Sequence, residues 1–485
     1  MELAMILVVP ALASGLSLST VGRRVAAQIT VLASAVVLVL AALLASEIAR
    51  TGPTSSLQGW LTCDGLGALV LLLVAFVGFT AALYSWGYIA HRVGPGQSGA
   101  PRIRLYYALY NLFVLSMLAV PVLANVALMW IAVELTTLLS AFLVGFEDTP
   151  EALEAAWKYV VLTTMGAVVA LLGFLILYWG SQISGYQQPF TWMGLIDAAP
   201  GMPPALVWLA FLFVLVGFGT KVGLVPMHTW LPDAHSQAPA SICALLSGVE
   251  TTTVLYVILR LFPVVGGAQA LDARPWFIGF GLLSVAVATL LLIYVRDYKR
   301  LFAFSTVEHM GIILVAAGFG GADAHVGAAY QMLSHSLAKS FCFFAAGIAV
   351  MAAGTQEIAA VRGLTRTSPL GGVMLLAGGL AIAGAPPFAV FTSELLIVRA
   401  GLEGGHYVVV GLLAFFVVTA FCAVMHHINC MTFGTPLRSG VQALTIPISC
   451  KATLALAAIP LVVAGLYLPA LLQGLLAAAA AAMGG

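Results

Sequence analysis

The chain has few charged residues. Only 8% of its 485 residues are Asp, Glu, Lys or Arg, the formal net charge is +1, and 62% of the residues are hydrophobic. A soluble domain carries about 25% charged residues, and no globular core could hide this much apolar surface from water. The near-neutral charge also argues against a nucleic-acid partner. We therefore expect a polytopic membrane protein whose solvent is the lipid bilayer.

Cysteine motifs and nucleotide-binding loops are lacking as well. The six cysteines contain no CxxC pair, so neither a disulfide framework nor an iron–sulfur or zinc site is indicated. No Walker loop, GxGxxG fingerprint or Ser-His-Asp arrangement occurs in a credible context. We therefore expect no cofactor, no metal and no catalytic chemistry in this chain. The N-terminal apolar run lacks the basic region and cleavage site of a signal peptide, which predicts that it is retained as a first helix.

Long apolar runs are abundant. Runs of about 20 residues are long enough to span a bilayer as helices, and they predict an all-α fold with fourteen transmembrane helices. The predicted helices cover residues 2–19, 26–47, 64–90, 105–123, 125–146, 158–180, 205–235, 240–261, 276–296, 300–319, 326–353, 370–399, 405–432 and 452–474.

The basic residues divide unevenly between the two sides of this predicted bundle. Thirteen of the nineteen Lys and Arg residues fall on one side and four on the other. By the positive-inside rule the first side is cytoplasmic, which predicts a protein of the cell inner (plasma) membrane with both termini on the outer face. The remaining two, Lys221 and Lys339, lie inside predicted helices.

Two predicted helices contain internal breakers. The seventh holds Gly223 and Pro226, and the twelfth holds Gly384, Pro386 and Pro387. Proline frees backbone carbonyls that hydrocarbon cannot satisfy, so such breaks survive only in protein or beside water. The breaks lie five helices apart, which predicts two inverted five-helix repeats with the functional path at the broken helices. The predicted organisation is residues 1–103 for helices 1 to 3, 104–262 and 275–433 for the two repeats, and 450–485 for the last helix.

Several titratable residues lie within the predicted helices, where one charge costs about 2.5 to 3.5 kcal/mol. They are Glu134, Lys221, Glu250, Glu308, His309, His335, Lys339 and Glu394. Gln331, His335 and Lys339 follow one helical face at i, i+4 and i+8, which favours proton transfer over metal binding. We predict that all of these except His309 form an ion path, with Glu134 and Lys221 as a pair whose separation sets the proton affinity of the lysine.

Each of these residues also has a purely structural interpretation. Lys221 could extend its side chain to the membrane surface. Glu308 could form a structural ion pair with Lys299 or Arg300, two turns away. Glu250 stands beside three threonines, which is also typical of a locally hydrated helix face. For Cys422, His426 and Cys430, which share one face of a single helix, we expect no metal site, because collinear residues cannot surround an ion.

The motifs resemble those of a known family. KVGLVPMHTWLPDAHSQAPASICALLSG, preceded by Glu134 and followed by a Pro-broken helix with Glu394, resembles the antiporter-like membrane subunits of complex I, Mrp antiporters and membrane-bound hydrogenases. LFAFSTVEHMGII, HSLAKSFCFFAAG, EIAAVRGLTRTSPL and AIAGAPPFAVFTSE are most similar to the hydrogenase-4 component F branch. The resemblance implies fourteen helices, a modulated pair of Glu134 and Lys221, a central path through His335 and Lys339, and Glu394 as exit-side acid. Thr252 departs from the family pattern, because a lysine or histidine often stands there.

These observations predict a proton-translocating, antiporter-like subunit of a larger hydrogenase-related or complex-I-related assembly, with Na⁺ as the alternative coupling ion. Its expected partners are the lipid bilayer, other membrane subunits and a peripheral redox module. Three alternatives remain open at this point: a stand-alone cation/proton antiporter, the membrane subunit of a bicarbonate or CO₂-uptake complex, and a scaffold that conducts nothing.

Overall fold

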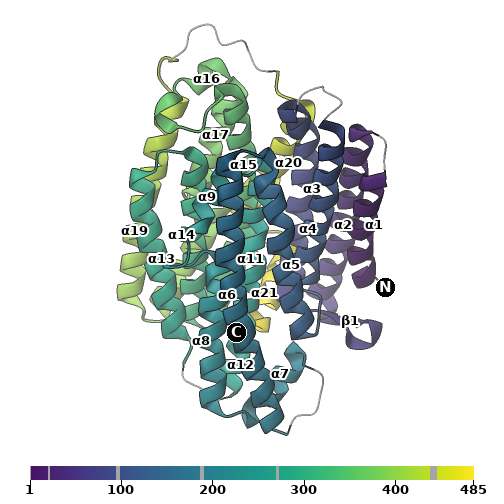
Figure 1. Cartoon of the computed structure of the whole chain (residues 1–485). Coiled ribbons are helices and arrows are strands. Elements are labelled where there is room, and N and C mark those ends of the chain that lie inside the picture. The colour runs from purple at the N-terminus through teal and green to yellow at the C-terminus, as the bar shows by residue number, and fades with distance from the viewer. Residues whose placement is uncertain are drawn as a thin grey trace.

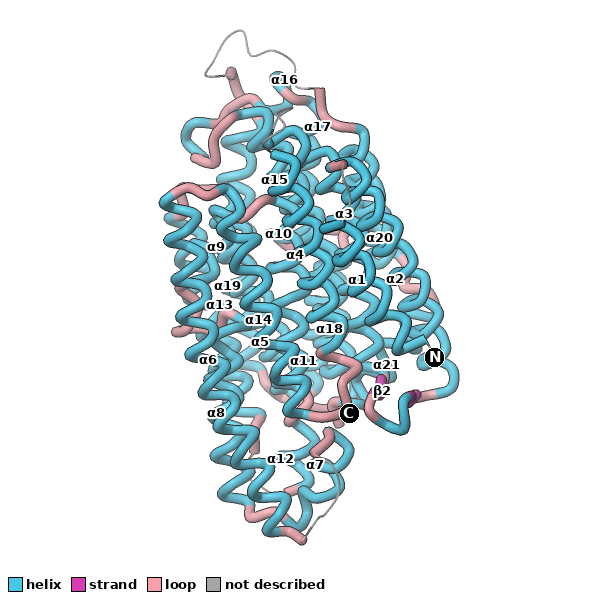
Figure 2. The backbone as a smooth tube through the Cα atoms, turned by 45° about the vertical axis from the view of Figure 1, so that its right-hand side comes forward, coloured by secondary structure: helices cyan, strands magenta, loops and turns pink. Residues whose placement is uncertain are grey.

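The structure, a computed structural model, describes residues 2–19, 22–93, 99–185, 190–268, 272–436 and 445–484. It is a bundle of roughly aligned helices with one short hairpin, as Figures 1 and 2 show. The helices are α1 Glu2–Ser19, α2 Arg23–Thr51, α3 Gly65–Val93, α4 Gly99–Ala119, α5 Val126–Val144, α6 Pro150–Ile183, α7 Trp192–Ala198, α8 Pro204–Val222, α9 Trp230–Gln237, α10 Ala240–Leu245, the π-helical segment η4 Leu246–Glu250, α11 Thr251–Leu259, α12 Phe262–Gly267, α13 Arg274–Tyr294, α14 Tyr298–Phe319, α15 Ala322–Ala353, α16 Leu364–Thr367, α17 Pro369–Ile382, α18 Ala389–Glu403, α19 Tyr407–Thr432, α20 Ile448–Leu466 and α21 Ala470–Ala482. Strands β1 Thr54–Ser56 and β2 Leu61–Cys63 pair antiparallel, and short 3₁₀ turns cover Leu57–Gly59, Gly145–Glu147, Ala199–Gly201 and Ile358–Ala360.

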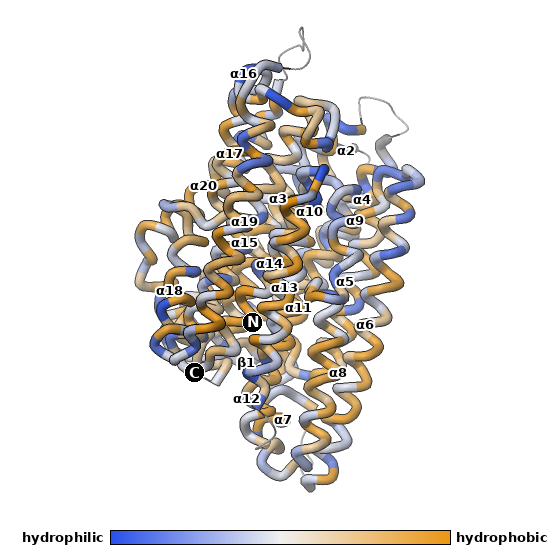
Figure 3. Tube along the Cα trace, turned by 90° about the vertical axis from the view of Figure 1, so that its left-hand side faces the viewer, coloured by the Kyte–Doolittle hydropathy of each residue, from blue (hydrophilic) through white to orange (hydrophobic). Residues whose placement is uncertain are grey.

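The bundle carries an apolar exterior, as expected of a membrane protein. In the described part of the chain, twelve helices are long and apolar enough to cross a bilayer, while α17 and α21 are apolar but shorter. Figure 3 shows hydrophobic residues along the helices and hydrophilic ones gathered toward the ends of the bundle. The prediction of an all-α polytopic membrane protein is confirmed. The count of fourteen helices stays a prediction.

The two predicted helix breaks are present. The first separates α8 from α9: Gly223 has φ +86°, and its N–H bonds to the carbonyls of Gly219 and Thr220 to close α8. The second separates α17 from α18, with Gly384 at φ +75°. Glycine adopts this left-handed conformation without steric cost, which explains its place at both breaks.

Two further interruptions differ from the sequence prediction. The predicted eighth helix contains the π-helical segment Leu246–Glu250, and the predicted helix at 452–474 divides into α20 and α21 around Tyr467 to Pro469. Pro469 has no N–H to continue the ladder, so it precedes the first residue of α21 instead of extending α20. The π-helical segment carries no such signal, because it contains no proline.

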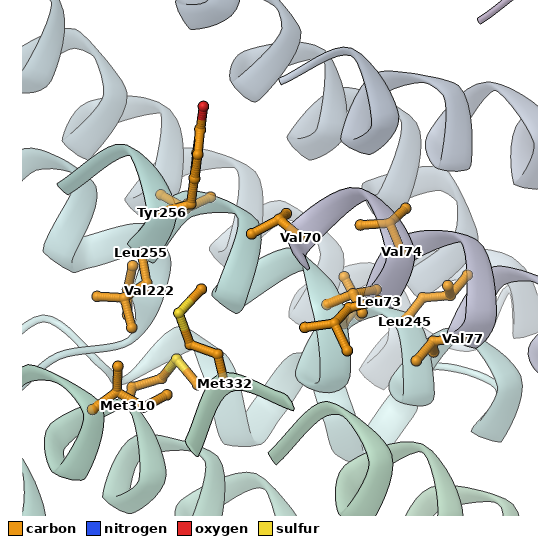
Figure 4. Close-up of a cluster of buried hydrophobic side chains, with 14 of the residues drawn as sticks. Val70, Leu73, Val74, Val77, Val222, Leu245, Leu255, Tyr256, Met310 and Met332 are labelled. Carbon is orange, nitrogen blue, oxygen red and sulfur yellow. The ribbon is translucent and has the colours of Figure 1, made fainter. Parts of the chain in front are cut away.

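Helix α15 runs unbroken for 32 residues through the centre of the bundle. It packs against α3, α10, α14, α17, α18, α20 and α21. Figure 4 shows part of the apolar core beside it, where Val222 lies near Leu255, Met310 and Met332. The core therefore encloses the last turn of α8, which contains Lys221.

Candidate functional site

The first polar centre is an ion pair between Lys221 at the end of α8 and Glu250 at the end of the π-helical segment. The Lys221 ammonium lies 3.2 Å from Glu250 Oε1, and the two side chains are 0% and 1% exposed. Tyr159 and Thr136 donate hydrogen bonds of 2.8 and 2.9 Å to the same oxygen, and Lys221 also donates to Thr137. Buried charges require such pairing and hydrogen bonding, and this pair has both.

This arrangement excludes the snorkelling interpretation of Lys221, because its side chain points into the core. Its direct ion-pair partner is Glu250, a residue for which the sequence left a purely structural interpretation open. The pairing of Glu134 with Lys221 stays a prediction. Glu134 accepts a 2.6 Å hydrogen bond from Thr164, and its second oxygen is buried without a hydrogen-bond partner among the described residues. Thr137, which contacts Lys221, lies one turn beyond Glu134 on α5, so any coupling of Glu134 to Lys221 acts without direct contact.

The π-helical segment joins this pair to α15. His335 Nε2 lies 3.0 Å from the Ser247 carbonyl, and Ser336 Oγ donates a 2.6 Å hydrogen bond to the Gly248 carbonyl. The wider π turn disturbs the regular ladder and is found mostly at functional sites. In this chain two of its carbonyls bond to the neighbouring helix, three and two residues before Glu250. The Lys221–Glu250 pair is thereby connected to α15 through the backbone of the π-helical segment.

The second polar centre lies between α14, α15 and the second break. The rings of His309 and His335 are 5.3 Å apart, and His309 Nδ1 lies 3.2 Å from the Gln331 amide nitrogen. His309 Nε2 lies 3.0 Å from the carbonyl of Ile382, the last residue of α17. Ser393 of α18 donates a 2.5 Å hydrogen bond to Gln331 Oε1. After the break, the Ser393 side chain therefore bonds to the polar face of α15, whereas before the break the Ile382 carbonyl reaches this face only through His309 of α14.

Lys339 lies on the same helix, one turn beyond His335, and is fully buried. Its ammonium donates a 2.7 Å hydrogen bond to the Phe302 carbonyl and another to Ser305 Oγ. Within the described residues it makes no ion pair. A lysine buried with only neutral acceptors is free to lose its proton without breaking a charge pair.

Glu308 lies one turn beyond Ser305 on α14 and is 5% exposed. The alternative that it pairs with Lys299 or Arg300 is wrong. Lys299 Nζ donates to the carbonyls of Ser236 and Ala238 at 2.9 and 2.6 Å. Arg300 instead pairs with Asp233 at 2.7 Å, which also lies 3.5 Å from Lys158. These contacts fasten α9 to α14 and α6, and they leave Glu308 without an ion pair in the described structure.

Glu394 lies against the second break. A Cβ atom added to Gly384 would sit 2.6 Å from Glu394 Oε2, so a larger residue there would require the carboxylate to shift. Both residues line a mostly apolar cavity of about 290 Å³ between α14, α18 and α19. The acid is partly exposed, in contrast to the fully buried Lys221–Glu250 pair.

Sequence reasoning missed most of the hydroxyl groups in these centres. The hydroxyl groups of Tyr159, Thr136 and Ser305 bond to a titratable side chain. The Ser393 hydroxyl bonds to the Gln331 amide, and Ser247 contributes its backbone carbonyl. Each looks ordinary in sequence, because Ser and Thr commonly bond to their own helix. Thr252 does so here: it bonds to the Gly248 carbonyl at 3.2 Å and contributes no titratable group.

Comparison with known proteins decides the family. A family model described as NADH:quinone oxidoreductase/Mrp antiporter, TM, matches residues 103–423. The chain belongs to this family. The matched range includes the residues of both polar centres, and the resemblance predicted from the motifs is confirmed.

Individual relatives extend the match. The hydrogenase-4 component F homolog of Methylacidiphilum infernorum (isolate V4) is 39% identical over 412 residues, 84% of this chain and 85% of that protein. NADH-quinone oxidoreductase subunit N of Desulforudis audaxviator (strain MP104C) is 30% identical over 406 residues, 81% of this chain and 77% of that protein. A chain of the membrane-bound sulfane sulfur reductase (MBS), an archaeal respiratory membrane complex, shares the fold with a TM-score of 0.86, 24% identity and coverage of 100% and 98%. These relatives are parts of multi-subunit membrane assemblies.

Proposed function

We propose that this chain is the proton-translocating, antiporter-like subunit of an energy-converting membrane complex of the hydrogenase type, in the plasma membrane with both termini outside. The observation that carries the proposal is the buried row of hydrogen-bonding groups from the Lys221–Glu250 pair through Ser247, His335 and His309. Groups of this kind pass protons by exchanging hydrogen bonds, with water completing the gaps. The 39% identity to a hydrogenase-4 component F homolog supports the hydrogenase-type assembly.

In this proposal Lys221 and Lys339 are the two loading sites. Glu250 holds the proton on Lys221, and displacement of that carboxylate releases it toward Ser247 and α15. Lys339 receives a proton from the central histidines, and Glu308 and Glu394 accept it toward the exit. Glu134 acts on Lys221 through space. A peripheral redox module supplies the driving force.

The direct test is proton uptake by proteoliposomes that contain the assembled complex, followed with a pH-sensitive dye. We expect Lys339→Ala to assemble normally and to lose most of the coupled uptake, because it removes the mid-membrane cation of α15. Lys158→Ala is the matched control, since Lys158 is a partly exposed lysine in surface ion pairs. Normal uptake by assembled Lys339→Ala would contradict the path through α15.

Two measurements separate this proposal from its alternatives. Replacing Na⁺ with choline at constant pH leaves uptake unchanged if protons alone move, and reduces it if Na⁺ is coupled. Mass spectrometry of the chains that co-purify tests the assembly: a [NiFe]-hydrogenase-like subunit supports the proposal. A zinc-binding soluble partner would instead assign the chain to a bicarbonate or CO₂-uptake complex, and full activity of the purified chain alone would make it a stand-alone antiporter.

A further inference from the structure

A second, unrelated polar cavity lies at the end of the molecule where α2 and α20 begin and α3 ends. Its volume is about 510 Å³. Arg23, Arg24 and Gln28 of α2 form one wall, Trp86 of α3 lines the floor, and Ser449 of α20 lies opposite. None of these residues contacts the ion pair or the central histidines. The cavity therefore needs an explanation of its own.

The chemistry of the lining fits an anion. Two arginines contribute to it, and its described lining contains no Asp or Glu. Ser449 Oγ is buried and makes no hydrogen bond to the described residues, so a hydroxyl donor remains available. Arginine presents a planar fork of N–H donors that matches phosphate oxygens. Basic pockets between helices at a membrane surface are typical sites for anionic headgroups.

A partly exposed apolar face of α3 continues from this cavity. The residues of α3 that are partly exposed at membrane depth recur every three or four positions, as Leu72, Phe76, Phe79, Leu83 and Trp86, and so share one face. Leu72 and Trp86 are fourteen residues apart, which corresponds to a rise of about 21 Å along the helix. This length is enough for an acyl chain that crosses half of a 30 Å hydrocarbon layer.

The neighbouring helices leave part of this face exposed. Both α2 and α20 pack on α3, whereas any contact between α2 and α20 in the described structure is slight. Farther along, α21 packs against both α2 and α3 and covers the beginning of α3. The close approach is seen at Gly65, where an added Cβ would lie 2.4 Å from the backbone of Ala478. Figure 2 places α2, α3 and α20 on the same side of the molecule.

We propose that this cavity binds the phosphate headgroup of an anionic phospholipid, and that one acyl chain of the lipid lies along the open face of α3. The arginines select the charge, the partly exposed apolar face of α3 selects a lipid over a free anion, and Trp86 stands between the two, as aromatic residues do at a membrane interface. The inference does not depend on the proposed transport function.

Native mass spectrometry of the full-length, delipidated protein titrated with phosphatidylglycerol or phosphatidylethanolamine tests the site. Wild type should bind phosphatidylglycerol more tightly. Arg23→Gln/Arg24→Gln should weaken that binding about 30-fold, since each basic residue near the surface contributes about 1 kcal/mol. Arg362→Gln/Arg366→Gln is the control, because it removes the same charge at the same end of the molecule, where Figure 1 shows α16.

Gln28→Glu provides a second variant that changes no volume. Its carboxylate should repel the headgroup, lowering phosphatidylglycerol binding and leaving phosphatidylethanolamine binding as it was. Equal affinity of wild type for the two lipids would overturn the proposal, as would undiminished phosphatidylglycerol binding by both variants. Binding that disappears when neighbouring subunits are retained would assign this face of α3 to a partner protein and also overturn the proposal.

Discussion

The two buried lysines are held in opposite ways. Lys221 at the end of α8 contacts a carboxylate that two further hydroxyl groups also stabilise. Lys339 of α15 bonds, among the described residues, to a carbonyl and a serine hydroxyl and to no carboxylate. A carboxylate at this distance stabilises the ammonium but not the amine, whereas neutral acceptors distinguish less between the two forms. The first site is therefore suited to hold a proton until its partner moves, and the second to pass one on.

We expect the largest effect on stability from a variant that removes the charge of one partner of the Lys221–Glu250 pair and leaves the other. Glu250→Gln keeps the shape and the hydrogen-bond acceptor but leaves Lys221 without a counter-charge. We expect a loss of about 3 to 5 kcal/mol in the free energy of unfolding, measured by denaturation of the purified protein. The double variant Lys221→Met/Glu250→Gln should regain most of that stability without regaining transport. Equal stability of the single and double variants would mean that the pair contributes no charge coupling.

The link between the two sites is the next target. His335→Gln can still donate a hydrogen bond to the Ser247 carbonyl but cannot titrate. If the histidine relays protons, coupled uptake should fall about 100-fold, as for the loss of a general acid or base, while thermal stability stays close to that of wild type. Uptake within a factor of two of wild type would mean that His335 does not relay protons between the Lys221 and Lys339 sites.

Substitutions of Glu134 test whether a charge that does not contact Lys221 still affects the first site. At about 10 Å and an effective dielectric constant of about 20, two unit charges interact by less than about 2 kcal/mol. Glu134→Gln should therefore slow coupled turnover about tenfold, and Glu134→Asp should retain part of it. Identical turnover in both variants would show that the charge at this position plays no part.

The smallest effect concerns the π-helical segment. Ser336→Ala removes the hydrogen bond to the Gly248 carbonyl and should cost about 1 kcal/mol in stability. Ser340→Ala is the matched control, because Ser340 bonds only within its own helix, to the Leu337 carbonyl at 3.0 Å. A larger loss of stability in Ser340→Ala than in Ser336→Ala would show that the hydrogen bond to η4 is not what stabilises the packing of η4 on α15.

The sequence predicts the fold class and the two proline breaks, because apolar length and proline chemistry are local properties. It also predicts the polar face of α15, since Gln331, His335 and Lys339 need only helical periodicity. It does not predict the π-helical segment, whose residues LSGVE have no distinctive composition. Pro469 indicates the division of α20 from α21, but the apolar residues on both sides of it favour a single helix in the sequence prediction.

Partners across helices were harder to predict. Glu134 and Glu250 are both acids in apolar helices, and only the packing of α5, α6, α8 and η4 decides which of them reaches Lys221. Similarly, Lys299 and Arg300 lie within two turns of Glu308, yet α9 offers them carbonyls and Asp233 instead. Spacing along one helix restricts which side chains can meet, but the rotation of each neighbouring helix determines which of them do.

The unbroken course of α15 has a consequence for the timing of the cycle. Because Gln331, His335 and Lys339 belong to one continuous helix, we expect their spacing of about 6 Å per four-residue step to stay constant throughout turnover. Six ångströms is too far for direct proton transfer between them, so intervening water molecules must come and go. We expect the rate to follow the thermodynamic activity of water: osmolytes too large to enter the protein should slow the coupled step while leaving the fold unchanged.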